Sequence, residues 1–238
     1  MTNIERHASF EHRHRNIHGG LARAAIFGVS DGLTTNISLV LGVAAANTGP
    51  GFVRLAGLAG LLAGSFSMAA GEYVSMRAQA ELFRRELRVE EAAIKADPDR
   101  EQRELARIYS SRGLRPALAD EVASQLMRDP DQALESHARD ELGIRPDQLG
   151  SPLGAAGSSL GAFGVGAAVP LLPWYFAQGT TAVLASVSLG AMAALAVGAG
   201  VGLATGRSPV RSSLRQLAIT ALAASVVFLV GRIVGVAA

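Results

Sequence analysis

The chain has 238 residues, of which 49% are hydrophobic and 5% aromatic, with 27 glycines and no cysteine. This composition is too apolar for an ordinary soluble domain, and the lack of cysteine excludes disulfides, iron–sulfur clusters and thiol catalysis. The net charge is +2, and the basic residues are not interleaved with aromatic ones, which argues against nucleic-acid binding. Sixteen of the 20 acidic residues lie between positions 77 and 147. The composition therefore predicts a membrane protein with one acidic insert.

The chain begins with a polar tail, residues 1–20, that holds four of the five histidines among several arginines. Their irregular spacing favours a basic flank over a metal site. The apolar run that follows, residues 21–46, is too long for a signal-peptide core and contains an aspartate. We therefore predict the first transmembrane helix here.

Asp31 lies within this first run, and Thr35 and Ser38 follow it on the same helix face. A carboxylate in a membrane helix is costly and usually functional. The alternatives are that Asp31 caps a broken helix or pairs with Arg23. The cost of leaving such a group unpaired favours a functional role.

The second run, Phe52–Met76, follows a tight polar turn and is long enough to cross a hydrocarbon core of about 30 Å. Met68 and Glu72 lie one turn apart on one face of this predicted helix. Residues 21–76 thus form an antiparallel helix pair. A ridge of small residues on the second helix permits close approach to a neighbour; these are Gly57, Gly60 and Gly64.

The insert, residues 77–149, is charged and strongly helical. The second helix is predicted to continue out of the membrane as a rod until Asp97-Pro98, which starts another helix that runs to about Ser111. A third helix is predicted from about Pro116 to near Gly143, with Asp129-Pro130 as a candidate interruption.

Several helices of this insert carry carboxylates at helical spacing, and one also carries a histidine. Each carboxylate alone could be part of a solvated helix face, so the case for a metal site rests on their convergence from several helices. The candidate ligands are Glu86, Glu90, Glu101, Glu104, His137 and Glu141.

Residues 150–238 contain three further apolar runs, at about 153–172, 180–205 and 214–236. The fold class is therefore all-α, with five transmembrane helices and a three-helix metal-binding insert between helices two and three. Lysine and arginine concentrate in the N-terminal flank, the insert and the 206–215 loop. The positive-inside rule places the N-terminus and the insert in the cytoplasm and the C-terminus outside.

Membrane carboxylates, a neighbouring thioether and a cluster of cytoplasmic carboxylates are together suited to conduct a cation. Carboxylates suit Mn²⁺ and Fe²⁺, and a thioether shifts the preference away from Mg²⁺ and Ca²⁺. An apolar setting favours a protonated carboxyl and a bound dication favours the ionised one, so exchange of metal for protons is chemically natural. The chain contains no Walker motif for ATP hydrolysis, and we expect neither an enzyme nor a resident cofactor.

Two stretches carry a family resemblance. Residues 28–43, GVSDGLTTNISLVLGV, and 67–75, SMAAGEYVS, resemble the first two helices of the vacuolar iron transporter family, and the resemblance extends over nearly the whole chain. It implies a homodimer that exchanges Fe²⁺ or Mn²⁺ for protons, with the ion passing between subunits. It further assigns Asp31, Met68 and Glu72 to the transport pathway, and Glu90, Glu101, Glu104 and Glu141 to metal binding in the insert.

The insert departs from the family pattern at two places. Ala93 stands where the family has a second glutamate, which Glu86 or Glu91 would have to replace. His137-Ala138 stands where plant-like members have two methionines. Imidazole is a good Fe²⁺ ligand, so His137 is a candidate replacement for a thioether.

Two other classes of function compete with transport. A membrane-anchored ferritin-like iron oxidase or store would also use glutamates on helices, but it calls for Glu-x-x-His motifs on bundle helices, and the helices of the insert contain none. A purely structural membrane protein would leave Asp31 and Glu72 unexplained.

Overall fold

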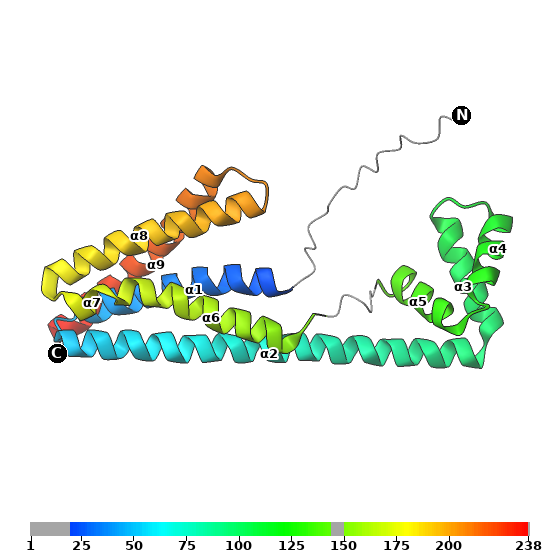
Figure 1. The fold of residues 1–238 in the computed structure, drawn as a ribbon, viewed down its shortest axis with the longest axis horizontal. Helices are drawn as coiled ribbons and strands as arrows, with labels where there is room; N and C mark the ends of the chain where they lie inside the picture. The colour runs from blue at the N-terminus through cyan, green and yellow to red at the C-terminus, as the bar shows by residue number, and fades with distance from the viewer. Residues whose placement is uncertain (1–19, 144–149, 238) are drawn as a thin grey trace, which may run out of the picture.

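The computed structural model describes residues 20–143 and 150–237, which form helices α1 to α9 and contain no strand (Figure 1). Residues 1–19 of the predicted tail, with their histidines, lie outside the described residues. The long helices gather at one end of the molecule, and three short ones lie at the other end of α2 (Figure 1).

Within the described residues, five helices are long and apolar enough to cross a membrane, which confirms the predicted number of spans. The insert-bearing helix α2 has 47 residues, about 70 Å at 1.5 Å per residue, more than twice the hydrocarbon core. The rest of α2 therefore projects beyond the bilayer, as the rod predicted from the sequence. The five helices are α1 (Gly20–Ala45), α2 (Pro50–Ala96), α6 (Pro152–Leu171), α8 (Gly179–Ala204) and α9 (Pro209–Ala237). A short helix, α7 (Pro173–Phe176), follows α6.

Helix α1 is the centre of the membrane part. Half of the residues in its 18-residue apolar stretch are buried, whereas the corresponding share in the other four helices is 17% to 28%. Its close contact with α6 depends on glycine: a Cβ at Gly32 would collide with the Phe163 carbonyl, and one at Gly166 with the Val29 carbonyl. Helix α9 approaches α1 in the same way at Gly231. Small residues thus let three backbones pack without side chains between them.

The predicted small-residue ridge of α2 is used inside the chain. A Cβ at Gly57 would meet Leu171 of α6 and Val40 of α1, and one at Gly64 would meet the ring of Phe163. Gly60 lies against Leu39 of α1 in the same way. The neighbours that the glycine ridge approaches are therefore α1 and α6 of the same chain.

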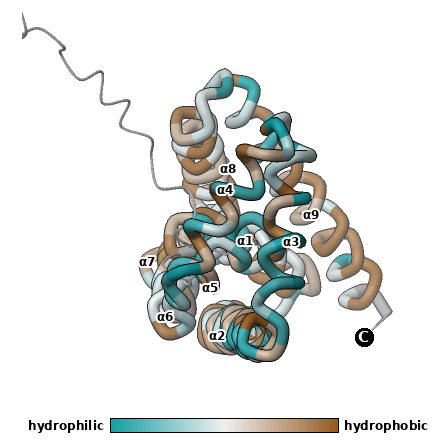
Figure 2. The backbone as a smooth tube through the Cα atoms, turned by 90° about the vertical axis from the view of Figure 1, so that its right-hand side faces the viewer, coloured by the Kyte–Doolittle hydropathy of each residue, from teal (hydrophilic) through white to brown (hydrophobic). Residues whose placement is uncertain are grey.

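The insert contains three short helices beyond the rod: α3 (Pro98–Ser111), α4 (Pro116–Leu126) and α5 (Pro130–Asp140). Asp97 caps α3, because its carboxylate accepts a hydrogen bond from the Arg100 N–H at 3.0 Å. The third helix expected from the sequence is divided, since Pro130 has no N–H and Asp129 caps the new helix through the Asp131 N–H at 2.9 Å. These helices form the hydrophilic end of the molecule (Figure 2).

We expect Gly166→Ala to destabilise the protein, because the added methyl would collide with backbone that cannot rotate away. The expected cost is about 1–3 kcal/mol, typical of overpacking. Gly161→Ala is the matched control in the same helix, since a Cβ there meets nothing within 4 Å. Thermal unfolding in detergent should show a lower midpoint for Gly166→Ala only. Equal midpoints for the two variants would contradict the tight crossing.

Candidate metal centre and membrane carboxylates

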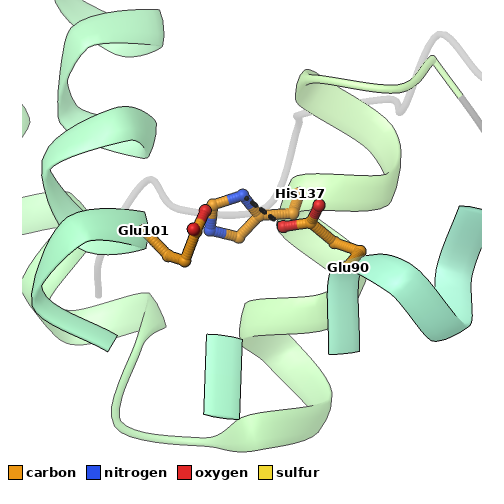
Figure 3. Close-up of side chains that lie close together, drawn as sticks. All are labelled: Glu90, Glu101 and His137. Atoms are coloured by element: carbon orange, nitrogen blue, oxygen red, sulfur yellow. Dashed lines mark ion pairs between the residues drawn. The ribbon is translucent and has the colours of Figure 1, made fainter. Parts of the chain in front are cut away.

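Three helices of the insert bring Glu90 of α2, Glu101 of α3 and His137 of α5 together (Figure 3). One ligating atom from each residue lies within 4.8 Å of the others. Their exposed fractions are 8% for Glu90, 6% for Glu101 and 0% for His137. Two carboxylates are thus buried beside one imidazole.

The donor set fits a divalent metal ion, and the unpaired atoms point to one. His137 Nε2 is buried and has no hydrogen-bond partner among the described residues. Glu90 Oε1 lies 3.1 Å from His137 Nδ1, yet the geometry makes no hydrogen bond and this oxygen also stays unpaired. Buried polar atoms are normally paired, since leaving one unpaired costs about 1–3 kcal/mol. One ligating atom of each residue could hold a metal ion here, and a mixed carboxylate and imidazole set suits first-row metals such as Fe²⁺ and Mn²⁺.

Electrostatics in the cluster favour binding of a cation. Burial raises the pKa of Glu90 above its ordinary value, and the nearby charges of Glu141, Glu101 and Glu104 raise it further, while His137 opposes them. Without a metal ion, the site therefore holds carboxylates that repel one another. A dication would remove this repulsion.

The other predicted ligands surround this group at different distances. Glu141 Oε2 lies 3.1 Å from His137 Nδ1, and Glu104, one turn beyond Glu101, is near enough to affect Glu90 electrostatically. Glu86 is half-buried on α2 but does not belong to the buried group. Glu91 is exposed and pairs with Lys95. It therefore does not take the place of the family glutamate at whose position this chain has Ala93.

A second contact, which the sequence did not reveal, holds α5 against α3. Tyr109 donates a hydrogen bond to Asp140 at 2.9 Å, and Arg112 bonds both the side chain and the carbonyl of Asp140. Burial and this hydrogen bond raise the pKa of Tyr109 to about 12. Burial alone would raise the pKa of Asp140, but the bonds from Arg112 and Tyr109 outweigh it and lower that pKa. The contact fixes the segment that carries His137 and Glu141.

In the membrane part, Asp31 of α1 is half-buried and accepts a hydrogen bond from Thr35 at 3.3 Å. Thr35 itself is exposed, so this side of α1 is not covered by the rest of the chain. Ser38, expected on the same stripe, instead is buried and donates to the Thr34 carbonyl at 2.7 Å. The predicted polar stripe is therefore limited to Asp31 and Thr35.

Glu72 of α2 forms an ion pair with Arg23 of α1, with 2.7 Å between Oε1 and the guanidinium nitrogen. The alternative that paired Arg23 with Asp31 is wrong, because Arg23 reaches the other helix. Met68, half-buried, lies one turn from Glu72 along α2. No sequence signal could have found the Arg23 partner, since 49 positions separate the two residues.

Comparisons with known proteins show the family of the chain. A sequence model of the VIT family matches residues 22–232. Vacuolar iron transporter 1 of Eucalyptus grandis is 34% identical over 91% of this chain and 88% of its own length. Vacuolar iron transporter 2 of Oryza sativa subsp. japonica is 36% identical, over 92% and 89%, and vacuolar iron transporter 1 of Arabidopsis thaliana is 32% identical, over 91% and 87%. The chain belongs to the VIT family and is a multi-pass integral membrane protein.

We expect Glu90→Gln and Glu101→Gln each to weaken Mn²⁺ binding to the full-length protein by at least about tenfold, because each removes a charged ligand. Glu91→Gln, an exposed neighbour, is the control, and calorimetry in detergent is the measurement. Equal Mn²⁺ affinities for all three variants would mean that the cluster has a structural role and does not bind the metal ion.

Glu90→Gln should also raise the thermal stability of the metal-free protein at neutral pH. The raised pKa of Glu90 means that its contribution to stability is present at acid pH and is lost as the pH rises through the folded-state value. Glutamine resembles the protonated form, so its advantage should shrink on acidification. A constant advantage at every pH would exclude titration of Glu90 as the cause.

Proposed function

We propose that this protein is a secondary transporter that moves Fe²⁺ or Mn²⁺ out of the cytoplasm in exchange for protons. The observation that carries the proposal is the buried group of Glu90, Glu101 and His137, with its unpaired atoms. Its member Glu90 lies on the same continuous helix as Met68 and Glu72. The names of the relatives support iron as a cargo.

In this proposal the insert faces the cytoplasm and captures the metal ion. The ion then passes Glu72 and Met68 toward Asp31, while carboxylates that release metal take up protons for the return step. Two carboxylates and one imidazole favour a first-row metal over Mg²⁺. A ferritin-like oxidase or store gains no support, because the buried group holds one histidine and the insert contains no Glu-x-x-His motif.

We further propose that the working unit is a homodimer whose second subunit covers the open side of α1 and α2. Thr35 and Phe27 are exposed beside Asp31 on α1. Helix α2 exposes a row of large apolar side chains at steps of three, four or seven residues, on the side away from its glycines. The row comprises Phe52, Leu55, Leu62, Phe66 and Tyr73.

Cross-linking tests this dimer directly, because the chain has no cysteine of its own. We expect Phe66→Cys to form a disulfide between two copies in nanodiscs under mild oxidation. Gly60→Cys should remain monomeric on denaturing gels, since Gly60 lies against Leu39 within the chain. Cross-linking at both positions, or at neither, would contradict the proposed interface.

Glu72→Gln is expected to lower Mn²⁺-driven proton movement in reconstituted vesicles by at least about tenfold. The reason is that the variant lacks the carboxylate that would balance the charge of the passing ion. Mn²⁺ binding by the insert should persist in this variant. Glu81→Gln is the matched control, since Glu81 also pairs with an arginine but is exposed. Wild-type flux with Glu72→Gln would exclude Glu72 from the pathway.

A further inference from the structure

The ion pair between Arg23 and Glu72 is unevenly exposed. The Arg23 side chain is 71% exposed, whereas that of Glu72 is 15% exposed. The carboxylate is therefore held between helices, while most of the arginine side chain lies in the open. The guanidinium can leave the pair for solvent without uncovering the protein interior.

The pair lies at the edge of the membrane part nearest the insert. Glu72 follows the first residue of α2 by 22 positions, which is about 33 Å and thus the full depth of a hydrocarbon core. Arg23 is in the first turn of α1. The start of α6 is adjacent, since Ser158 donates a hydrogen bond to the Leu21 carbonyl at 3.0 Å. Three helices thus meet around this ion pair where a metal ion coming from the insert would enter.

A metal ion and a guanidinium compete for the same carboxylate. Arginine carries a permanent charge, so it does not leave Glu72 by losing its proton. A pair with one exposed partner is weak, and a dication can displace it. A monovalent ion, with half the charge, gains less from the exchange.

We infer that Arg23 is a tethered cation that occupies the Glu72 carboxylate until a metal ion displaces it. The inference rests on the proposed path through Glu72. Entry of metal is then an exchange of one cation for another, and the guanidinium returns to Glu72 once the ion has moved toward Met68. Arg23 thereby lowers the apparent affinity for metal at the entrance and opposes backward movement of the ion.

The test is the Mn²⁺ concentration dependence of initial transport rates in reconstituted vesicles. Arg23→Gln removes the competitor and should lower KM about two- to fivefold, the range expected for loss of an exposed ion pair. Arg23→Lys should stay near the wild type. Arg77→Gln is the control, because Arg77 belongs to an exposed pair farther along α2.

Chemical modification tests the charge alone in a protein that has already folded. The chain has no native cysteine, so Arg23→Cys can be modified selectively. An aminoethyl methanethiosulfonate, which restores a tethered cation, should raise KM toward the wild type. Methyl methanethiosulfonate, which adds no charge, should leave KM at the Arg23→Gln value.

An unchanged or higher KM for Arg23→Gln, or equal effects of the two reagents, would overturn the inference. An equal fall in KM for Arg77→Gln would also overturn it, since the effect would then come from the general surface charge. Glu72→Gln separates this failure from that of the proposed path: wild-type transport in that variant refutes the path itself.

Discussion

The close backbone contact of α1 with α6 and α9 is the constraint on which the rest of the structure depends. It is possible only because Gly32, Gly166 and Gly231 have no side chains. In a bilayer, where apolar side chains gain little by leaving lipid, such close packing is a main source of helix association. The contact buries one half of α1 and leaves the side with Asp31 and Thr35 uncovered. The same packing therefore holds the protein together and presents its membrane carboxylate.

Helix α2 connects the two chemical sites of the molecule. Its membrane part packs on α1 and α6 and carries Met68 and Glu72, and its projecting part supplies Glu90 to the buried group. A continuous helix has a fixed rise and rotation per residue, so the positions of Glu72 and Glu90 are not independent. Any tilt of α2 in the membrane would therefore move Glu90 relative to the other membrane helices.

The two sites handle negative charge in different ways. In the insert, carboxylates lie close together, and the structure leaves Glu90 and His137 with unpaired atoms. Nearby, each carboxylate oxygen of Asp140 accepts a hydrogen bond, one from Tyr109 and one from Arg112, which fixes α5 without adding an unpaired charge to the cluster. At the membrane entrance, Glu72 has an arginine partner. In our proposal, a metal ion relieves repulsion at the first site, whereas it must displace a cation at the second.

Local signals in the sequence were enough to determine the five spans, the projecting rod and the start of α3, because hydropathy, proline and capping residues act within a few turns. They also marked Glu90, Glu101 and His137 as candidates. Only the tertiary structure decided that these three meet while Glu86 stands apart, that Arg23 pairs with Glu72 rather than Asp31, and that the α2 glycines face the chain's own helices. These outcomes depend on how helices cross and rotate against one another, and residues tens of positions apart carry no local trace of that geometry.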